Sequence, residues 1–266
     1  MLTKRVLAAA DGLLVEDVIC TSGRSSWSPP EPTESYSVVF VRRGCFRRRV
    51  DGLESFLDPV SIYFDEPGRE QQVAHPSDGG DECTQIVLSS AMVESVWGDY
   101  RPPPRPVFTT AAADLAHRQL VSSARSGDTF ELVERIGELL AAVRDCGTRI
   151  GFRGRATTAA ARRRVVDDAR EAIAIQPTIG LFELARVVAV SPHHLSRIFR
   201  AETGETISRY RNRARVRVAL ERLADRERSL ARLACELGFA DQAHLARVVR
   251  REVGSTPSAL RSSLGI

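Results

Sequence analysis

The chain has 266 residues, of which 43% are hydrophobic and 27% are charged. This length predicts one or two domains, and this composition excludes a mainly disordered chain. No apolar run reaches the roughly 18 residues that a membrane-spanning helix needs, and residues 1–10 lack the apolar core of a leader peptide. We therefore expect a cytoplasmic protein with no membrane partner.

The cysteine pattern disfavours a zinc finger and a disulfide framework. The five cysteines are odd in number and widely scattered, and no two have C-x-x-C spacing. Reduced thiols are the expectation, which also fits the cytoplasm. These residues are Cys20, Cys45, Cys83, Cys146 and Cys235.

The net charge of the chain, +4, conceals a strong asymmetry between its two parts. Residues 1–150 hold 16 basic and 22 acidic residues, a net charge of −6, whereas residues 151–266 hold 22 and 12, a net charge of +10. An acidic part joined to a strongly basic part is typical of a sensor or partner domain attached to a nucleic-acid-binding domain.

Residues 13–90 are predicted to form antiparallel β-structure. Segments rich in β-branched and aromatic residues recur roughly every 8–12 residues and alternate with turn residues. The Asp51-Gly52 pair, for example, favours a two-residue hairpin. The pattern indicates a small antiparallel barrel or sandwich. The expected strands are residues 35–41, 46–50, 53–57, 60–64 and 84–88, with turns at 42–45, 51–52, 58–59 and 67–68.

Two helices are expected after the proline-rich stretch at residues 101–106, and they form a helical hairpin. They cover residues 111–125 and 128–145. Apolar residues at three-to-four spacing make a stripe on the second helix, and this stripe either covers the β domain or forms a dimer interface. Its members are Phe130, Val133, Ile136, Leu140 and Val143.

Glycines at positions 147, 151 and 154, where the charge also changes sign, indicate a linker. We therefore expect an α+β protein of two domains. Residues 1–146 form the β domain with its helical hairpin, residues 147–158 form the linker, and residues 159–266 form an all-α domain.

The all-α region contains an internal repeat. The pattern Leu181-x-x-Leu184-Ala185-x-x-Val188 matches Leu230-x-x-Leu233-Ala234-x-x-Leu237. Further on, four residues of the first copy match four of the second, namely Leu195, Arg197, Arg200 and Gly204 against Leu245, Arg247, Arg250 and Gly254. Each copy predicts a helix-turn-helix.

Capping residues support the helix boundaries of both copies. Ser191 and Asp241 are suited to cap the second helix of each copy at its N-terminus. Pro192 follows at the first helical position, where its missing N–H is harmless. Gly204 and Gly254 can adopt the left-handed conformation that ends a helix.

A long helix, residues 208–223, is expected to join the two copies. Val216, Leu220 and Leu223 form its apolar stripe, and Arg211, Arg213, Arg215 and Arg217 lie around it. Its roughly 27 Å length is close to the roughly 34 Å between successive major-groove faces of B-DNA. One chain is therefore expected to place two recognition helices in adjacent grooves.

The region from about residue 178 to 261 resembles the DNA-binding domain of the AraC/XylS family of bacterial transcription regulators. The more specific pattern lies in the second copy: Ala234-x-x-x-Gly238-Phe239-x-Asp241-x-x-x-Leu245-x-Arg247, followed by Gly254-x-x-Pro257-x-x-Leu260-Arg261. The β region with two helices is similar to the family's cupin-like effector domain. Two positions depart from the family pattern, Ala189 for the usual Gly and Val249 for the usual Phe.

The resemblance implies which side chains meet DNA. Arg can contact guanine in a bidentate way, and His, Ser and Gln can also bond base edges. The alternative for these faces is simple solvation, and for the two turn histidines it is packing. The expected base-facing residues are His193, Ser196, Arg197, Gln242, Ala243, Ala246 and Arg247. The expected phosphate contacts are His194, Arg200, His244, Arg250 and Arg251.

The β domain offers weaker indications of a ligand site. Aromatic residues facing inward would line an effector pocket, although core packing is their default role. We expect His75 to lie in a polar loop, residues 75–81, at the mouth of the barrel. With one histidine in this region, we expect no metal, no cofactor and no enzymatic activity. The effector-site candidates are Trp27, Tyr36, Phe64 and His75.

Two further groups in the β domain carry open alternatives. Five arginines crowd one predicted hairpin, either as solvated charges or as contacts for an anionic ligand or DNA. Cys45 and Cys83 are either inert core residues or redox sensors. The arginines are Arg42, Arg43, Arg47, Arg48 and Arg49.

The sequence thus predicts a sequence-specific DNA-binding transcription regulator that responds to a small-molecule effector. Its expected partners are promoter DNA, the effector, a second copy in a homodimer and, for an activator, RNA polymerase. Two alternatives belong to other classes, a cupin-type metal-dependent enzyme and a nucleoid-type protein that binds DNA without sequence preference.

Overall fold

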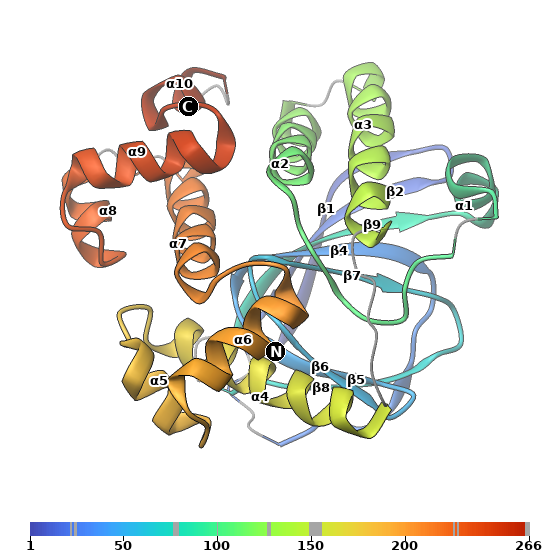
Figure 1. Ribbon diagram of the computed structural model, residues 1–266. Helices are drawn as coiled ribbons and strands as arrows, with labels where there is room; N and C mark the ends of the chain where they lie inside the picture. Colours follow the sequence, from blue (N-terminus) through green and yellow to red (C-terminus); the bar gives the residue numbers. More distant parts are fainter. Residues whose placement is uncertain are drawn as a thin grey trace. The chain divides into compact units, whose positions relative to one another are not determined.

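The computed structural model describes residues 1–263 except positions 22, 24, 25, 77–79, 100, 127, 128, 149–155, 226 and 228. The chain divides into two compact units, centred on Met1–Ile150 and Gly151–Arg261. The first unit is rich in sheet and the second is helical (Figure 1). Among the described residues, no helix is both long and apolar enough to cross a membrane.

The first unit contains two antiparallel sheets. The larger has the strand order β1-β2-β9-β4-β7-β10, and the smaller has the order β3-β8-β5-β6. The larger sheet consists of β1 (Leu2–Ala10), β2 (Leu13–Cys20), β4 (Tyr36–Gly44), β7 (Ser61–Asp65), β9 (Asp81–Leu88) and β10 (Val107–Phe108). The smaller consists of β3 (Glu31–Pro32), β5 (Phe46–Val50), β6 (Leu53–Leu57) and β8 (Glu70–Ala74).

Side chains on the two faces of the larger sheet enter two different cores. On β4, Val38 and Phe40 join a core shared with helices, whereas Val39 and Val41 pack toward residues of the smaller sheet. Because both faces are covered, the middle of β4, residues 38–41, is a continuous apolar run instead of alternating with polar residues. The unit therefore has three layers, which are helices, the larger sheet and the smaller sheet.

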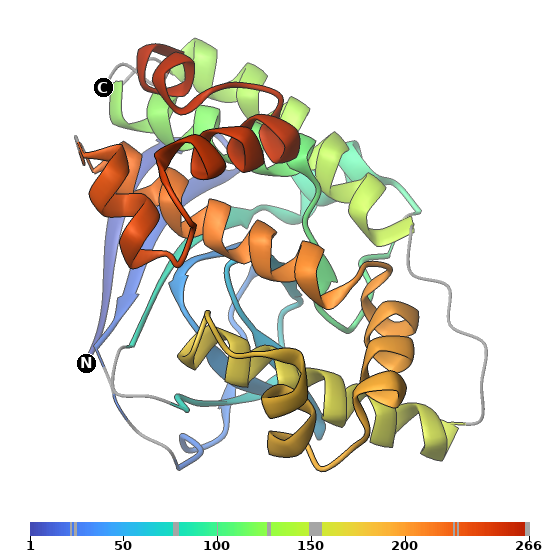
Figure 2. The same cartoon turned by 60° about the vertical axis from the view of Figure 1, so that its left-hand side comes forward.

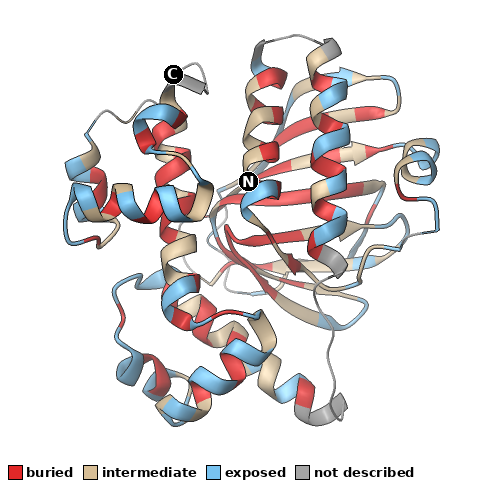
Figure 3. Ribbon diagram, turned by 45° about the horizontal axis from the view of Figure 1, so that its top comes forward, coloured by how far each residue is buried: buried red, intermediate tan, exposed pale blue. Residues whose placement is uncertain are grey.

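The helical layer consists of α2 (Ala111–Ser126) and α3 (Thr129–Thr148), and α1 (Ser90–Trp97) adds Trp97 to the same core. Figure 3 shows that α2 and α3 are buried along one side and exposed along the other. Ile136, Leu140 and Val143 of the predicted stripe pack onto the sheet, whereas Val133 is 52% exposed. Covering the sheet is thus the observed role of Ile136, Leu140 and Val143, and the side chain of Phe130 lies outside the described residues.

The second unit is helical throughout its described part. Its α4 is the longest helix there, and α7 lies between the α5–α6 pair and the α8–α9 pair (Figures 1 and 2). The helices are α4 (Ala156–Ile175), α5 (Leu181–Val187), α6 (Pro192–Thr203), α7 (Ile207–Ala224), α8 (Leu230–Glu236), α9 (Gln242–Val253) and α10 (Pro257–Ser263).

The predicted caps are present on α6 and α9. Ser191 Oγ accepts a hydrogen bond from the backbone N–H of His194, and the Asp241 carboxylate accepts one from His244. Gly204 and Gly254 end the two helices in the left-handed conformation, with φ of 76° in both. These local bonds satisfy terminal backbone groups that the helices themselves leave unpaired.

Several expectations for the first unit were wrong or incomplete. Residues 42–44 continue β4 instead of turning, and β9 begins at Asp81 instead of residue 84. The edge strand β1, the strand β8 and the helix α1 were not anticipated. β8 reads Glu-Gln-Gln-Val-Ala, with little of the β-branched and aromatic content that marks a strand. Of the expected linker, residues 147–148 end α3, residues 156–158 begin α4, and 149–155 lie outside the described residues.

The arginine-rich hairpin is not a solvated one. Arg42 is buried and its guanidinium lies 2.7 Å from Asp17 Oδ1. Arg48 is buried too, where it donates to Asp65 and, at 3.0 Å, to Gln71 Oε1. Arg47 pairs with Glu54 at 2.8 Å. Acidic partners within the sheets thus neutralise these charges, which strand composition alone does not reveal.

Candidate functional site

The outer face of α6 is built from three exposed polar side chains, His193, Ser196 and Arg197. On the opposite face Leu195, Ile198 and Phe199 are buried. The buried residues fix the helix in its unit, so the exposed ones are held at defined positions one helical turn apart. Arg197 donates a hydrogen bond to His194 Nδ1 at 3.2 Å, which steadies its side chain without burying it.

The outer face of α9 has the same construction and a different chemistry. Gln242, Ala243 and Arg247 are exposed and Ala246 is half-buried, above a buried face formed by Leu245, Val248 and Val249. Two alanines leave this face with fewer hydrogen-bonding groups than the face of α6. The buried Val249, where the AraC/XylS pattern usually has Phe, fits into the core with no exposed surface.

The two turn histidines differ in how they are held. The ring of His244 packs edge-on against Phe239 at 5.4 Å, and its Nδ1 accepts a bond from the backbone N–H of Ala240 at 3.4 Å. The ring of His194 accepts from Arg197 instead. Both are half-buried. Turn packing, one of the two roles left open for them, therefore describes His244 well.

Four further arginines lie along these helices, Arg200 on α6 and Arg247, Arg250 and Arg251 on α9. Arg200, Arg247 and Arg250 are exposed, and their guanidinium groups make no hydrogen bond or ion pair with any residue that the structure describes. Arg251 is exposed and donates to Glu252 at 3.1 Å. Exposed guanidinium groups of this kind are suited to bind the phosphate or base-edge acceptors of DNA.

A buried arginine of α7 holds the two helix pairs together. Arg215 donates to the carbonyl of Pro177, just before α5, and to the carbonyl of Gly238 at 3.2 Å, in the turn between α8 and α9. Its guanidinium also lies 5.7 Å from the centre of the Phe239 ring. Burial lowers the pKa of Arg215 from its usual value. Of the four arginines expected around the apolar stripe of α7, Arg215 and Arg217 are buried.

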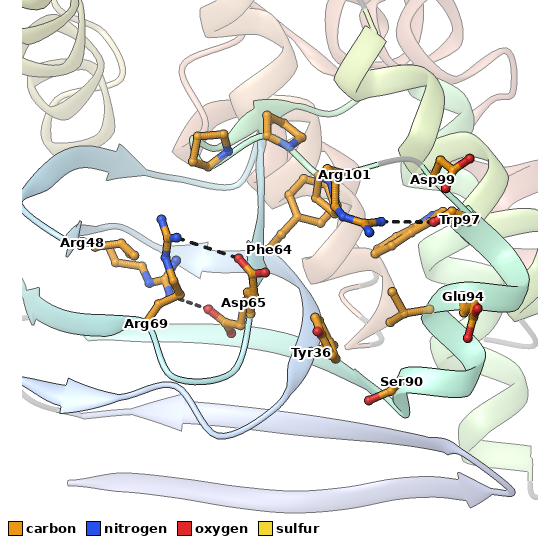
Figure 4. A pocket seen from close by; sticks show the side chains of 17 residues that line it. Tyr36, Arg48, Phe64, Asp65, Arg69, Ser90, Glu94, Trp97, Asp99 and Arg101 are labelled. Atoms are coloured by element: carbon orange, nitrogen blue, oxygen red, sulfur yellow. Dashed lines mark hydrogen bonds and ion pairs between the residues drawn. The ribbon is translucent and has the colours of Figure 1, made fainter.

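The first unit contains a cavity of about 750 Å³ beside α1 (Figure 4). Tyr36 and Phe64, two of the predicted effector-site residues, line it together with Trp97, Arg69 and Arg101. Phe64 and Trp97 meet edge-on at 5.9 Å. The volume and the mixture of aromatic and charged groups are within the range of small-molecule sites.

A second cavity, of about 640 Å³, is lined by residues of both sheets. Tyr63 and Gln85 line it, and burial raises the pKa of Tyr63 well above its usual value. His75 lines this cavity and not the first one. Trp27 lines neither; the guanidinium of Arg49 lies 4.1 Å from its ring.

His75 directly follows β8, in the segment where a polar loop at the mouth of the barrel was expected, but it does not face solvent. Its side chain is buried, and Nε2 lies 2.6 Å from Oδ1 of Asp81, which belongs to β9. Cys83 donates its thiol to the other oxygen of Asp81 at 3.2 Å. Burial, with Asp81 next in importance, raises the pKa of the Cys83 thiol well above its usual value. A count of histidines could not reveal this cluster, because strand pairing brings its members together.

A protein-family model described as a helix-turn-helix domain matches residues 184–263 of this chain. The regulatory protein SoxS of Salmonella typhimurium is 32% identical over 90 residues, which cover 34% of this chain and 84% of SoxS. The HTH-type transcriptional regulator Rv1931c of Mycobacterium tuberculosis is 33% identical over 81 residues. That match covers 30% of this chain and only 31% of Rv1931c.

Among solved structures, that of ToxT from Vibrio cholerae O395 aligns with 96% of this chain and 99% of its own, at 11% identity and a TM-score of 0.37. The curated relatives align with a smaller share of this chain. The HTH-type transcriptional regulator GlxA of Rhizobium meliloti, for example, is 32% identical over 35% of this chain and 28% of its own length. The chain therefore spans about a third of the length of Rv1931c and of GlxA.

Proposed function

Because the chain belongs to the AraC/XylS family of transcription regulators, we propose that α5–α6 and α8–α9 are two helix-turn-helix units that bind promoter DNA with sequence specificity. The observation that carries this proposal is the pair of exposed faces on α6 and α9. Each exposed face lies opposite a buried apolar face. Both helices are capped at the equivalent residue and end at a glycine in the left-handed conformation. The chain regulates transcription through this contact.

Each face has residues suited to base contact and residues suited to phosphate contact. His193, Ser196 and Arg197 of α6 read bases, and on α9 Gln242 and Arg247 do so while Ala243 and Ala246 meet thymine methyl groups. The phosphate contacts come from His194, Arg200, His244, Arg250 and Arg251. The buried bridge from Arg215 to both helix pairs supports a fixed spacing between the two faces, which successive major grooves require.

Titration of DNA with single variants tests this assignment. The operator is first selected from a random DNA pool with the full chain. Arg197→Ala should then weaken operator binding by about 1–3 kcal/mol and relax the preference at one base pair, and Arg247→Ala should relax another. Arg200→Ala, one turn further along α6, should weaken binding to operator and random DNA alike and lower the salt slope by about one.

Two results would contradict the assignment. An equal loss on all DNAs for Arg197→Ala would make Arg197 a phosphate contact and α6 wrongly oriented. Selection that yields no preferred sequence would favour the nucleoid-type alternative. Arg186→Ala serves as the control, because Arg186 is an exposed arginine of the same unit that lies on α5, outside the two faces.

The first unit senses a small-molecule effector. The two sheets, which pack face to face, form the cupin-like barrel, and the effector occupies the cavity lined by Tyr36 and Phe64. Residues 1–146 form this effector or dimerisation domain, 147–158 the linker and 159–266 the DNA-binding domain. A homodimer, and contact with RNA polymerase if the protein activates, complete the proposed assembly.

Reporter assays test the effector site. Phe64→Ala should abolish the response of a reporter promoter to the effector and leave DNA binding intact. Trp27→Ala should preserve the response, because Trp27 lies outside this cavity. The reverse pattern would show that the effector binds outside the cavity beside α1.

A further inference from the structure

Three different metal-binding side chains meet at one end of the two sheets of the first unit. The Cys20 Sγ, a ring nitrogen of His75 and a carboxylate oxygen of Asp81 all lie within 4.8 Å of one another. A fourth donor is adjacent, since the Cys83 thiol lies 3.2 Å from Asp81 Oδ2. His75, Asp81 and Cys83 are buried, and Cys20 is half-buried.

Strand register places three of these groups on one face of the larger sheet. Cys20 of β2 is paired directly with Asp81 of β9, and Cys83 follows two residues later on β9, so its side chain is on the same side as that of Asp81. His75 follows the end of β8 in the other sheet. The four side chains therefore come from both layers and converge between them.

Two glycines permit the close backbone approach that this convergence requires. A Cβ on Gly80 would lie 2.0 Å from the carbonyl oxygen of Cys20, and one on Gly44 would lie 2.1 Å from the carbonyl oxygen of Gly80. Both have positive φ, 63° and 70°. Three chain segments are thus pressed together at the cluster, which limits how far Cys20 and Asp81 can move apart.

The His75–Asp81 hydrogen bond alone does not account for the cluster. It explains one imidazole and one carboxylate oxygen, whereas the Cys83 thiol donates to the same carboxylate and the Cys20 thiol lies within 4.8 Å of it. Within the described residues the Cys20 thiol has no hydrogen bond. All four residues line the cavity of about 640 Å³ between the sheets, which provides a route for a ligand to reach them.

We propose that Cys20, His75, Asp81 and Cys83 bind a divalent cation of the zinc class. Thiolate sulfur, imidazole nitrogen and carboxylate oxygen are the donors that Zn²⁺ takes, and two sulfurs exclude Mg²⁺ and Ca²⁺. Tetrahedral bonds of about 2.0–2.3 Å separate the donors by roughly 3.3–3.8 Å, and the donor atoms of Cys20, His75 and Asp81 already lie within 4.8 Å of one another. Both thiols release a proton to solvent as the ion binds.

Four protein donors fill a tetrahedral ion, so the site has no open position for catalysis. It differs in this respect from the metal-dependent enzyme that was weighed as an alternative function. It lies wholly in the first unit and does not depend on the proposed DNA binding. The proposed site departs from the expectation of no metal, which rested on the number of histidines in this region.

Cobalt titration of the full chain tests the proposal. The protein is reduced with a phosphine, stripped with a chelator and titrated with Co²⁺ and then with Zn²⁺. We expect one ion per chain, with the intense visible absorption of a tetrahedral site and near-ultraviolet sulfur-to-cobalt charge transfer, both lost when Zn²⁺ displaces Co²⁺. Cys20→Ser should weaken Zn²⁺ binding by about 100-fold or more and reduce the charge-transfer intensity.

Cysteines outside the cluster provide matched controls. Cys45→Ser removes a buried thiol of the same unit, and Cys235→Ser removes the exposed thiol of the other unit. Both should bind Zn²⁺ as the parent does. The proposal is overturned if the parent binds no ion with thiolate charge transfer, if Cys20→Ser binds as tightly as the parent, or if Cys235→Ser removes binding. Since Cys20 is half-buried, Cys20→Ser should keep the far-ultraviolet circular dichroism of the parent.

Discussion

The two helix pairs of the second unit share one design and differ at their turns. In each pair a seven-residue helix with a buried Leu-Ala step precedes a twelve-residue helix capped by Ser191 or Asp241. The residue that makes the left-handed turn is Ala189 in the first pair, with φ of 54°, and Gly238 in the second, with φ of 71°.

The surroundings of these two residues explain the difference. Ala189 is exposed, so its methyl group extends into open space and only backbone strain opposes it. A Cβ on Gly238 would lie 2.8 Å from Thr178 Cγ2 and 3.3 Å from the guanidinium of Arg215. The second turn packs against α7 and the start of the first pair, whereas the first turn is peripheral. Packing, more than local conformation, therefore decides which turn requires glycine.

Arg215 should show the largest effect, because it is the shared contact of both pairs. Arg215→Leu removes a charged donor from the carbonyls of Pro177 and Gly238 and should destabilise the second unit by about 2–5 kcal/mol. Calorimetric unfolding of the full chain measures this. Arg209→Ala is the control, because Arg209 is 67% exposed and its ion pair with Glu205 should contribute at most about 1 kcal/mol. Equal stability of the two variants would contradict a stabilising role for the hydrogen bonds of Arg215.

Gly238→Ala should have the next largest effect and destabilise the second unit by about 2–3 kcal/mol. Left-handed strain contributes about 1–2 kcal/mol and the clash with Thr178 adds to it. Thr178→Ser removes the clashing methyl group, so the double variant should recover the steric part and keep the strain. A double variant as unstable as Gly238→Ala would show that Thr178 does not restrict this turn. Urea unfolding of the three variants measures the coupling.

Ala189→Gly should change stability in the opposite direction and by less. Glycine relieves the left-handed strain of the folded chain. It also raises the conformational entropy of the unfolded chain, which offsets part of this gain, so we expect a net stabilisation of about 0.5–1 kcal/mol. The same unfolding assay measures it. Destabilisation by this substitution would contradict the strained turn.

The smallest contrast concerns pH. Burial raises the pKa of Glu205, after α6, against the opposing effect of Arg213. The stability that this carboxyl group affords is full below its usual pKa and falls as pH rises through the raised one. Glu227, before α8, has its pKa lowered to about 2, first by Arg232, so its contribution is full above the usual 4.5 and falls toward pH 2.

Glutamine variants separate these two effects. From about pH 2 to pH 7, the stability difference between parent and Glu205→Gln should change in one direction, and that between parent and Glu227→Gln in the other. Denaturant unfolding at several pH values measures both curves. Parallel curves would contradict the opposite pKa shifts.

Local features of the sequence were good guides to local structure. The Asp51-Gly52 turn has φ of 45° and 79° and joins strands in which Val50 pairs with Leu53, as a two-residue hairpin does. β8 and α1 were missed because their residues have mixed preferences and are ordered by neighbouring elements. The residues on the faces of α6 and α9 were predicted from the family resemblance, and their exposure agrees with the 3.6-residue period of burial.

The repeat, the caps and the exposed faces were determined by the sequence itself. A cap or a helix face depends on residues within about four positions of one another, and those are visible as spacing. The burial of Arg215 and the meeting of Cys20 with His75 and Asp81 were decided by the tertiary structure. Their partners lie far away in the chain, and only the packing of one helix pair on another, or the pairing of β2 with β9, brings them within reach.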